Sequence, residues 1–284
     1  MKGKNLLYTI GDAVAVTLFN LCLLLLAIIV PALSIGGTPS WYQKQFEKTG
    51  IYATVDEDGT QHRTTIYYIG GKPSQRATFS DEQLDEIIDH IVNFLYTDQE
   101  SFALTMDGVM LNGTLTDGVE IFGETSVGHM QDVKNLFRFF LVLGIVLFVV
   151  WLGAIAYGVW RWRFVKGRLL KYTLIFYGVF IALIGAFCLW VVCDLSAEGR
   201  EITADNFADK LWDNFHHLIF PFQDDKFANS FFNDTLTSVL TLDFFLNAVK
   251  TVLAVVFAVL ALWIGGIIAL RIIERKKAQT KQLE

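Results

Sequence analysis

The chain has 284 residues, of which 53% are hydrophobic and only 18% are charged, and its mean hydropathy is +0.43. This composition is too apolar for an ordinary soluble domain and too mixed for a chain that lies wholly inside a bilayer. Part of the chain must therefore stand in water, and the formal net charge of −6 belongs mainly to that part.

Four apolar runs are long enough to cross the hydrocarbon core as helices, which takes about 20 residues. They cover approximately Val14 to Leu33, Phe139 to Trp160, Tyr172 to Val192 and Thr251 to Leu270. The first run follows Lys2 and Lys4, as a signal peptide would, but it is longer than a typical cleaved segment. We expect a retained anchor and a mainly α membrane protein, built as a four-transmembrane-helix bundle.

Cations gather at three places beside these spans, and their positions predict the orientation of the chain. They are Lys2, Lys4, Arg161, Arg163, Lys166, Arg168, Lys171, Arg271, Arg275, Lys276 and Lys277. These cations precede the first span, fill the link between the second and third spans, and follow the fourth. We therefore expect both termini and the short link to be cytoplasmic, and the two long acidic loops to be extracytoplasmic.

This topology divides the chain into five segments. They are the N-terminus and first span (1–35), an extracytoplasmic cap (36–137), the second and third spans with their basic link (138–193), an aromatic extracytoplasmic loop (194–247), and the fourth span with a basic tail (248–284). The cysteines, Cys22, Cys188 and Cys193, all fall within spans. They therefore offer no disulfide framework to the outer loops.

The polar residues of the spans have simple structural interpretations. Asn20 lies in the middle of the first span and is predicted to form a hydrogen bond between helices. Asp12 and Lys250 lie at span edges, where a charge costs less free energy than at the bilayer centre.

The cap begins with a hairpin pattern. Ile51 to Val55 and Thr64 to Ile69 are β-rich runs on either side of the turn pair Asp58-Gly59, which predicts that the two runs pair. Ser80 and Gln83 then form a capping box ahead of apolar residues at helical spacing. These residues are Ile87, Ile88, Ile91, Val92 and Leu95. We expect an amphipathic helix on the cap or on the membrane surface.

The rest of the cap contains three turn signals, Asp107-Gly108, Asn112-Gly113 and Asp117-Gly118. Short apolar pieces such as Val119 to Phe122 follow or separate them, which predicts further small strands. The cap is therefore expected to be mixed α/β.

All five histidines lie in the two outer loops. One of them begins the stretch His129-Met-Gln-Asp132-Val-Lys134, just ahead of the second span. In a helix, Asp132 lies about 60° from His129, whereas Lys134 and Arg138 point nearly opposite. We expect the His129–Asp132 face to look inward and the two cations to reach toward water.

A histidine can exchange protons near neutral pH, and a neighbouring carboxylate can hold its tautomer. His129 with Asp132 therefore suits acid–base chemistry. The alternative is structural: His129 merely caps the membrane helix, and Asp132 is a first-turn acid that complements the helix dipole.

The second histidine stretch is Phe215-His216-His217-Leu-Ile-Phe220, in the aromatic loop. The aromatic residues of this loop are Phe207, Trp212, Phe215, Phe220, Phe222, Phe227, Phe231, Phe232, Phe244 and Phe245. Such a loop between two spans is predicted to lie along the interface and to contact lipid. His216 is either a proton-transfer group or an interfacial residue like its neighbours.

Other kinds of site are less well supported. His129, Asp132, His216 and His217 offer ligands for zinc, but neither an HExxH motif nor paired cysteines accompany them. His62, beside the hairpin turn, and His90, on the amphipathic helix, are expected to be solvated surface residues. The chain lacks a Walker loop, a G-x-S-x-G elbow and a Rossmann glycine pattern, which argues against nucleotide chemistry and ordinary serine-hydrolase chemistry.

The two histidine motifs, in this order and on the same side of the membrane, resemble those of the bacterial integral membrane family of the lipoprotein intramolecular transacylase. The resemblance runs from the first span to the last and includes Asn233-Asp-Thr-Leu236 and Phe244-Phe245. The chain departs from the family pattern in the hairpin of Ile51 to Ile69, in Thr241 where proline is expected, and in the additional His217.

The resemblance implies an acyltransferase of the bacterial plasma membrane, with its active site on the extracytoplasmic side. Such an enzyme moves the sn-2 acyl chain of a diacylglyceryl lipoprotein to the α-amine of its N-terminal cysteine, which gives a lyso-form lipoprotein. The partners it implies are diacylated lipoproteins and membrane lipid, without nucleic acid, soluble cofactor or metal.

The resemblance also implies that His129 and His216 are the catalytic residues. We expect His216 to act as the base and Asp132 or Glu124 to orient its partner, with His217 in support and Phe215 and Phe220 against lipid. A covalent acyl-histidine intermediate stays open. The alternative functions are a non-enzymatic extracytoplasmic sensor or assembly partner and a metal-dependent membrane hydrolase.

Overall fold

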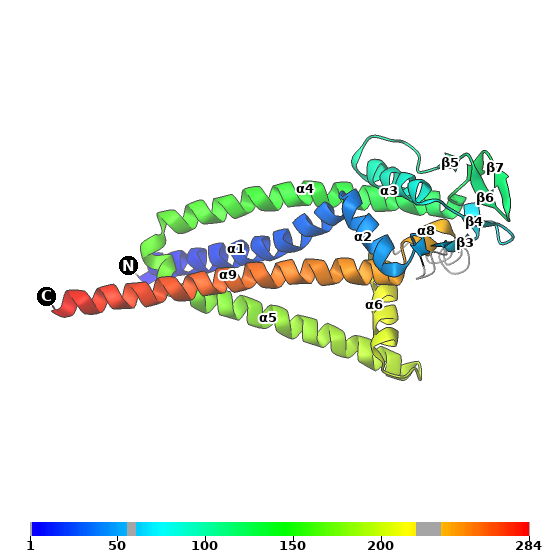
Figure 1. The fold of residues 1–284 in the computed structure, drawn as a ribbon. Coiled ribbons are helices and arrows are strands. Elements are labelled where there is room, and N and C mark those ends of the chain that lie inside the picture. Colours follow the sequence, from blue (N-terminus) through cyan, green and yellow to red (C-terminus); the bar gives the residue numbers. More distant parts are fainter. Residues whose placement is uncertain (1, 56–60, 220–233, 284) are drawn as a thin grey trace. The chain divides into compact units, whose positions relative to one another are not determined.

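The computed structural model describes residues 2–55, 61–219 and 234–283. These residues form two compact units (Figure 1). The first, here called the helical unit, contains residues 2–28, 144–219 and 254–283. The second, the mixed unit, contains residues 29–55, 61–143 and 234–253.

Four long helices carry the apolar runs of the sequence. They are α1 (Lys2–Gly36), α4 (Glu124–Trp160), α5 (Trp162–Ala197) and α9 (Leu242–Leu283). Each contains a stretch that is long and apolar enough to cross a membrane, so the prediction of four membrane helices is confirmed. The helices exceed the predicted spans because their helical backbone continues into more polar sequence at one or both ends.

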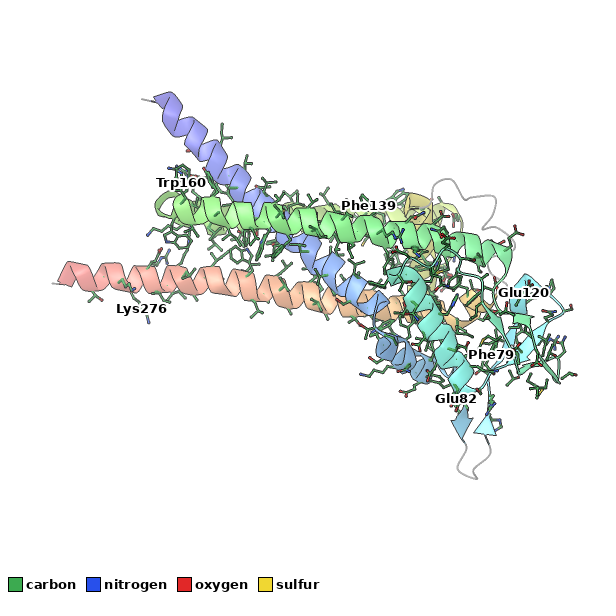
Figure 2. The ribbon with its side chains drawn as sticks, turned by 90° about the horizontal axis from the view of Figure 1, so that it is seen from above. Phe79, Glu82, Glu120, Phe139, Trp160 and Lys276 are labelled. Atoms are coloured by element: carbon green, nitrogen blue, oxygen red, sulfur yellow. The ribbon has the colours of Figure 1, made fainter. Side chains whose placement is uncertain are left out.

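The surfaces of these helices are apolar where the sequence predicts lipid. Large hydrophobic side chains are exposed along all four, among them Val14, Phe139, Val149, Trp160, Ile181, Leu189, Phe257 and Leu262. Figure 2 shows Trp160 at the end of α4. Exposing so large an apolar surface to water would cost free energy, whereas the hydrocarbon core of a bilayer solvates it.

Polar side chains connect the helices inside the helical unit. Asn20 is fully buried, donates to the Thr173 hydroxyl at 3.1 Å and accepts from the Trp263 indole at 3.0 Å. The predicted hydrogen bond between helices is therefore confirmed. Asp12 lies near the start of the first span, as predicted, and it is 0% exposed and ion-paired with Arg161 and Arg168. A carboxylate in this apolar setting needs such partners.

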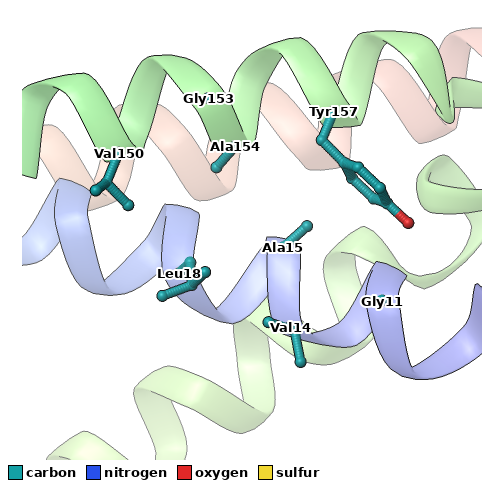
Figure 3. Close-up of a pocket in the computed structure, with 8 residues that line it drawn as sticks. All are labelled: Gly11, Val14, Ala15, Leu18, Val150, Gly153, Ala154 and Tyr157. Carbon is teal, nitrogen blue, oxygen red and sulfur yellow. The ribbon is translucent and has the colours of Figure 1, made fainter.

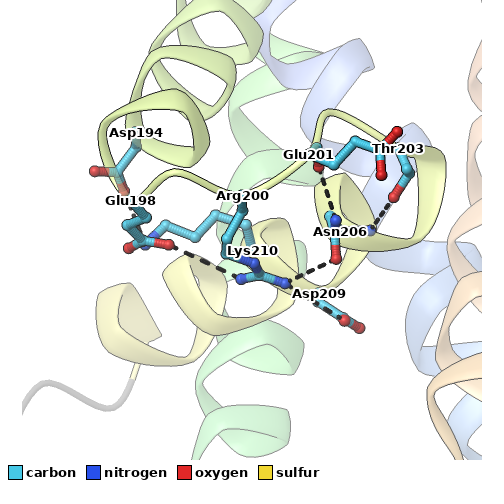
Figure 4. A network of polar contacts seen from close by, with 8 residues as sticks. All are labelled: Asp194, Glu198, Arg200, Glu201, Thr203, Asn206, Asp209 and Lys210. Atoms are coloured by element: carbon cyan, nitrogen blue, oxygen red, sulfur yellow. Dashed lines mark hydrogen bonds and ion pairs between the residues drawn. The ribbon is translucent and has the colours of Figure 1, made fainter.

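The end of α5 is bonded to the next helix, α6 (Ala204–Ile219). Figure 4 shows the network: Lys210 of α6 contacts Asp194 at 2.9 Å and Glu198 at 2.5 Å, and Arg200 contacts Asn206 at 3.1 Å. Hydrogen bonds to Glu198 and Asp194 raise the pKa of Lys210. The ammonium therefore stays charged and holds the middle of α6 against the end of α5.

The mixed unit contains three small antiparallel sheets. β1 (Thr54–Val55) pairs with β2 (Gln61–His62), and β5 (Thr105–Met106) pairs with β8 (Val119–Glu120). The third sheet has the order β3–β4–β6–β7, formed by Thr65–Tyr67, Arg76–Thr78, Val109–Leu111 and Thr114–Thr116.

The predicted hairpin is wrong in its pairing. The run of Ile51 to Val55 pairs with Gln61–His62, and the run of Thr64 to Ile69 pairs instead with β4. Ile66 faces the core at 2% exposure, because the β3–β4 pairing places it beside buried Ala77. The predicted turn at Asp58-Gly59 lies outside the described residues.

The later turn signals of this unit are confirmed. Asn112 and Gly113 connect β6 to β7 with φ values of 50° and 82°, the left-handed conformation that asparagine and glycine adopt most readily. Two further turns are bonded to each other: Gly108 N–H donates to the Asp117 carboxylate at 2.9 Å, and Gly118 N–H donates to the Asp107 carboxylate at 2.8 Å.

Three helices complete the mixed unit: α2 (Pro39–Thr49), α3 (Asp81–Tyr96) and α8 (Thr235–Val239). The predicted capping box of α3 is confirmed, because Ser80 and Gln83 exchange hydrogen bonds. Figure 2 shows Phe79 and Glu82 at its N-terminal end, where Phe79 is buried and Glu82 exposed. One face of α3 packs into the core through its buried residues Leu84, Ile87, Ile88, Ile91, Phe94 and Leu95.

One core holds the mixed unit together. Its fully buried side chains include Phe46, Ile69, Ile87, Ile88, Phe94, Phe102 and Ile121. His90, predicted to be solvated, is half-buried: its Nε2 lies 2.8 Å from the Phe102 carbonyl oxygen. Phe244, predicted at the lipid interface, is also a core residue and packs edge-on against Trp41. His62 is exposed, as predicted.

The core predicts a large difference between two substitutions in the mixed unit. Ile88→Ala removes a fully buried side chain and should lower the free energy of unfolding by about 2–5 kcal/mol. Leu115→Ala, at a position 67% exposed, should change it by no more than about 0.5 kcal/mol. Unfolding of the purified full chain in detergent, followed by intrinsic fluorescence, measures both. Equal effects would contradict this core.

Candidate functional site

Contacts with two other segments fix the start of the helix that carries His129. α4 starts at Glu124, and the residue before it, Gly123, donates its backbone N–H to the Asp234 carboxylate at 3.0 Å. A Cβ on Gly123 would come within 3.0 Å of the Gly71 backbone. Any larger residue would require the Gly71 backbone to move by a few tenths of an ångström, so two distant segments pack closely against the first turn of α4.

Asp234 is the centre of this junction. Its carboxylate is 2% exposed and caps α8. The next residue, Thr235, donates its hydroxyl to the Ile121 carbonyl at 2.6 Å. Burial raises the pKa of Asp234, although hydrogen bonds from the backbone amides of Gly123, Thr235 and Gly71 oppose that shift.

His129 lies on the inward face of α4. It is 9% exposed, and Ser126 and Met130, which share its face at helical spacing, are buried with it. Val133, one turn further, packs against the core. The imidazole therefore lies in a mainly apolar environment that also contains the Ser126 hydroxyl, one turn from the Asp234 junction.

The two carboxylates predicted to assist His129 differ in position. Asp132 is half-buried and follows His129 by three residues, so it lies on an adjacent part of the same helix face. Glu124 is exposed, and its five-residue separation from His129 places it on a different side of α4. Of the two, only Asp132 shares the environment of the histidine.

The prediction that Lys134 reaches toward water is wrong. Its side chain is 2% exposed, donates to the Gln99 carbonyl at 2.5 Å, and places its ammonium 4.3 Å from the centre of the Phe94 ring. Carbonyl and ring together replace the water that a buried ammonium loses. Arg138 does reach the surface, where it contacts Asp98 at 3.0 Å.

The second histidine motif falls in the last part of α6. Phe215, His216 and His217 belong to the helical backbone of Ala204–Ile219, which the Lys210 network fixes to α5 at its other end (Figure 4). Their side chains, and the whole of Phe220, lie outside the described part of the chain. The roles predicted for these four residues therefore stay predictions.

Within residues 2–55, 61–219 and 234–283, no three His, Cys, Asp or Glu side chains are grouped as a metal site.

Sequence reasoning missed Ser126 as a site neighbour, and it noted Asp234 only as part of a motif. The capping box that Asp234 forms with Thr237 was the available local signal. That signal predicts a helix start, but the partner at Gly123 is 111 residues away.

Comparisons with known proteins agree with the family resemblance of the two histidine motifs. The family model described as "Lipoprotein intramolecular transacylase Lit" matches residues 14–245. No curated protein matches the chain. A solved structure of the membrane integral lipoprotein intramolecular transacylase Lit from Bacillus cereus is similar in fold, with a TM-score of 0.54 and 15% sequence identity. That similarity covers 96% of this chain and 99% of the other.

The raised pKa of Asp234 predicts how its contribution to stability changes with pH. The folded state binds a proton more tightly than the unfolded state, so the contribution is complete below about pH 4 and decreases as pH rises through the raised value. The stability of the wild-type protein relative to Asp234→Asn should therefore fall as pH rises.

Thermal unfolding of both proteins in detergent across a pH series measures this difference. Asp89→Asn, at an exposed position of α3, is the matched control for the change from carboxyl to amide. A difference between wild-type protein and Asp234→Asn that stayed constant or grew with pH would contradict the assignment.

Proposed function

Because the chain belongs to the family of the lipoprotein intramolecular transacylase Lit and is therefore an acyltransferase, we propose that it converts diacylglyceryl lipoproteins to the lyso form. In this reaction the sn-2 acyl chain moves from the glycerol oxygen to the α-amine of the N-terminal cysteine. The product is an N-acyl, S-monoacylglyceryl lipoprotein.

The reaction needs two proton removals from nitrogen, one proton delivery to oxygen and no change of oxidation state. A base removes a proton from the cysteine ammonium, whose pKa is about 8. The free amine attacks the ester carbonyl and the new C–N bond forms. The base, after releasing its first proton to water, removes a second proton from this nitrogen, because the product amide carries only one hydrogen, and the C–O bond to glycerol breaks. An acid then protonates the departing glycerol oxygen. Because both reacting groups belong to one molecule, correct positioning provides much of the rate enhancement.

His129 and His216 are the groups proposed for these proton transfers. The observation that carries the proposal is the position of His129: it is 9% exposed on the inward face of α4, in the region that the family model matches. An imidazole that titrates near neutral pH can give and take protons there. We assign the base to His216 and the acid to His129.

Asp132 is the better candidate for orienting His129. It is half-buried three residues beyond the histidine, whereas Glu124 is exposed on another side of the helix. A carboxylate that accepts from one imidazole nitrogen directs the other toward the substrate. We therefore retain Asp132 in this role and leave Glu124 as the weaker alternative.

We place the reaction at the outer leaflet of a bacterial plasma membrane. Contacts in the helical unit support the topology: Asp12 near the start of α1 pairs with Arg161 and Arg168 of the basic link, and Arg271 of α9 donates to the Gly167 carbonyl at 2.8 Å. The three cation-rich regions thus lie at one end of that unit. By the positive-inside rule that end is cytoplasmic.

The substrate is membrane-embedded, so its acyl chains need apolar surroundings. Phe215 and Phe220 are the lipid-contacting residues proposed from the second motif, and His217 is a supporting group beside His216. Membership of a transacylase family argues against the non-enzymatic sensor. It also disfavours the metal-dependent hydrolase, because acyl transfer within one substrate molecule needs no activated water.

The histidine roles predict the outcome of three substitutions. His129→Ala and His216→Ala should each reduce acyl migration by at least about 100-fold, the contribution typical of acid–base catalysis. His62→Ala, at an exposed histidine of β2, is the matched control and should retain full activity. Mass spectrometry of the lipidated N-terminal peptide of an abundant lipoprotein, from cells that lack N-acylation, distinguishes diacylglyceryl from N-acyl-monoacylglyceryl cysteine.

Immunodetection of each variant in the membrane fraction accompanies the measurement. Full activity in His129→Ala or His216→Ala would remove that histidine from the mechanism, and a loss confined to His217→Ala would move the assignment to the neighbouring residue. An unchanged diacyl form with the wild-type chain present in the membrane would overturn the proposed reaction.

A further inference from the structure

Three Asp, Glu, Lys or Arg side chains are buried in the described part of the chain. They are Asp12, Lys134 and Asp234. Burial removes the water that a charge needs, so each of them requires polar partners inside the protein. Asp234 has such partners, because its carboxylate accepts the backbone N–H groups of Gly123 at 3.0 Å and Thr235 at 2.5 Å.

Asp12, in the helical unit, is compensated more fully. Arg161 and Arg168 form ion pairs with it, and the Tyr157 hydroxyl donates to it at 3.1 Å. Figure 3 shows Tyr157 on α4 near Gly11, the residue that precedes Asp12 on α1. A Cβ on Gly11 would lie 3.0 Å from the Tyr157 hydroxyl, so glycine leaves room for this contact. Both buried acids therefore have strong donors.

Lys134 has weaker partners. The residue is 2% exposed, and its ammonium donates to the Gln99 carbonyl at 2.5 Å and lies 4.3 Å from the centre of the Phe94 ring. Among the described residues no carboxylate forms an ion pair with it, and Asp98, the neighbour of Gln99, pairs with Arg138 instead. An uncharged carbonyl and a ring offset less of the desolvation cost than a carboxylate would. An apolar side chain of similar length would pack here without that cost.

Lys134 lies on the helix that carries His129. It follows the histidine by five residues, which places the two side chains about 140° apart around the axis of α4. Its partners belong to another part of the mixed unit, since Phe94 is on α3 and Gln99 is in the segment that follows α3. The other anchor of α4, at the Asp234 junction, precedes Lys134 by about three turns. His129 lies between these two anchors.

Two anchors are needed to fix the direction of a side chain on a helix. A contact at the start of α4 holds that end in place, and a second contact on another face limits rotation about the helix axis. A hydrogen bond limits rotation more than apolar packing does, because it has a preferred distance and angle, whereas the hydrophobic effect is non-directional. Catalytic groups must be held within about 10–20° of their productive direction. This requirement gives a buried ammonium an advantage over an apolar side chain.

We propose that Lys134 is a positioning residue for the acyl transfer. Its hydrogen bond to the Gln99 carbonyl fixes the rotation of α4 and thereby the direction of the His129 imidazole. Lys134 takes no part in the proton transfers and acts through His129. The inference rests on the proposed acid–base role of His129 and adds a residue to the machinery of that proposed function.

The matched pair of variants is Lys134→Met and Arg138→Met. Both remove a cation of α4 that contacts the segment after α3, but the Arg138 pair with Asp98 is exposed and contributes little. The kcat and KM of the purified full chain in detergent are measured with a synthetic diacylglyceryl lipopeptide, whose conversion is followed by mass spectrometry. Lys134→Met should lower kcat at least about tenfold, because misplacing a catalytic group by about 1 Å costs up to about 100-fold. KM should change little, and Arg138→Met should match the wild-type protein.

Thermal unfolding of the same proteins distinguishes positioning from a purely structural role. Lys134→Met loses one hydrogen bond but also removes the desolvation cost of a buried charge, so its Tm should not fall below that of the wild-type protein. A structural role predicts a lower Tm together with the lower kcat. A destabilised or unfolded Lys134→Met protein would therefore overturn the inference, as would one of full activity.

Lys134→Arg provides a second test. Arginine can donate to the Gln99 carbonyl and lie against the Phe94 ring, but it is larger than the lysine that it replaces. If the hydrogen bond positions His129, the kcat of Lys134→Arg should lie between those of the wild-type protein and Lys134→Met. If only the packed volume matters, methionine is the better substitute, and a kcat of Lys134→Arg no higher than that of Lys134→Met would overturn the inference.

His129→Ala, measured in parallel, separates this inference from the proposed function. An inactive His129→Ala protein together with a fully active Lys134→Met protein would overturn the positioning role alone. A fully active His129→Ala protein would overturn both the acid–base role of His129 and the inference that rests on it.

Discussion

The candidate site of the mixed unit depends on the hydrogen bonds that the buried carboxylate of Asp234 accepts. It accepts the backbone N–H of Gly123 at 3.0 Å, at the point where α4 begins. A buried carboxylate without hydrogen bonds would be strongly destabilising, so the junction forms only when α8 and the start of α4 are both in place. The inward orientation of His129, less than two turns along α4, follows from this anchor.

The same constraint acts in the helical unit. Asp12 and Asn20 are fully buried among apolar side chains, and each is satisfied by groups from other helices. In a bilayer, where water cannot compensate an unpaired polar group, such contacts specify which helix faces meet. Dispersion packing alone provides little of that specificity, because lipid tails compete equally for apolar surfaces.

The proposed chemistry needs few protein groups. An acyl transfer within one substrate molecule needs positioning and two proton-transfer groups. The chain, an acyltransferase by family, offers a nine-tenths buried His129 with the half-buried Asp132 on the adjacent helix surface.

Local sequence determined the four membrane helices, the capping box at Ser80 and the turn at Asn112-Gly113, because each depends on neighbouring residues alone. The family and its two histidine motifs were also evident from sequence. Tertiary structure decided the pairing of the strand at Thr65 with β4, the burial of Lys134 and the junction at Asp234. Each of these depends on a partner distant in the chain, and no local pattern encodes the partner of a buried charge or strand edge.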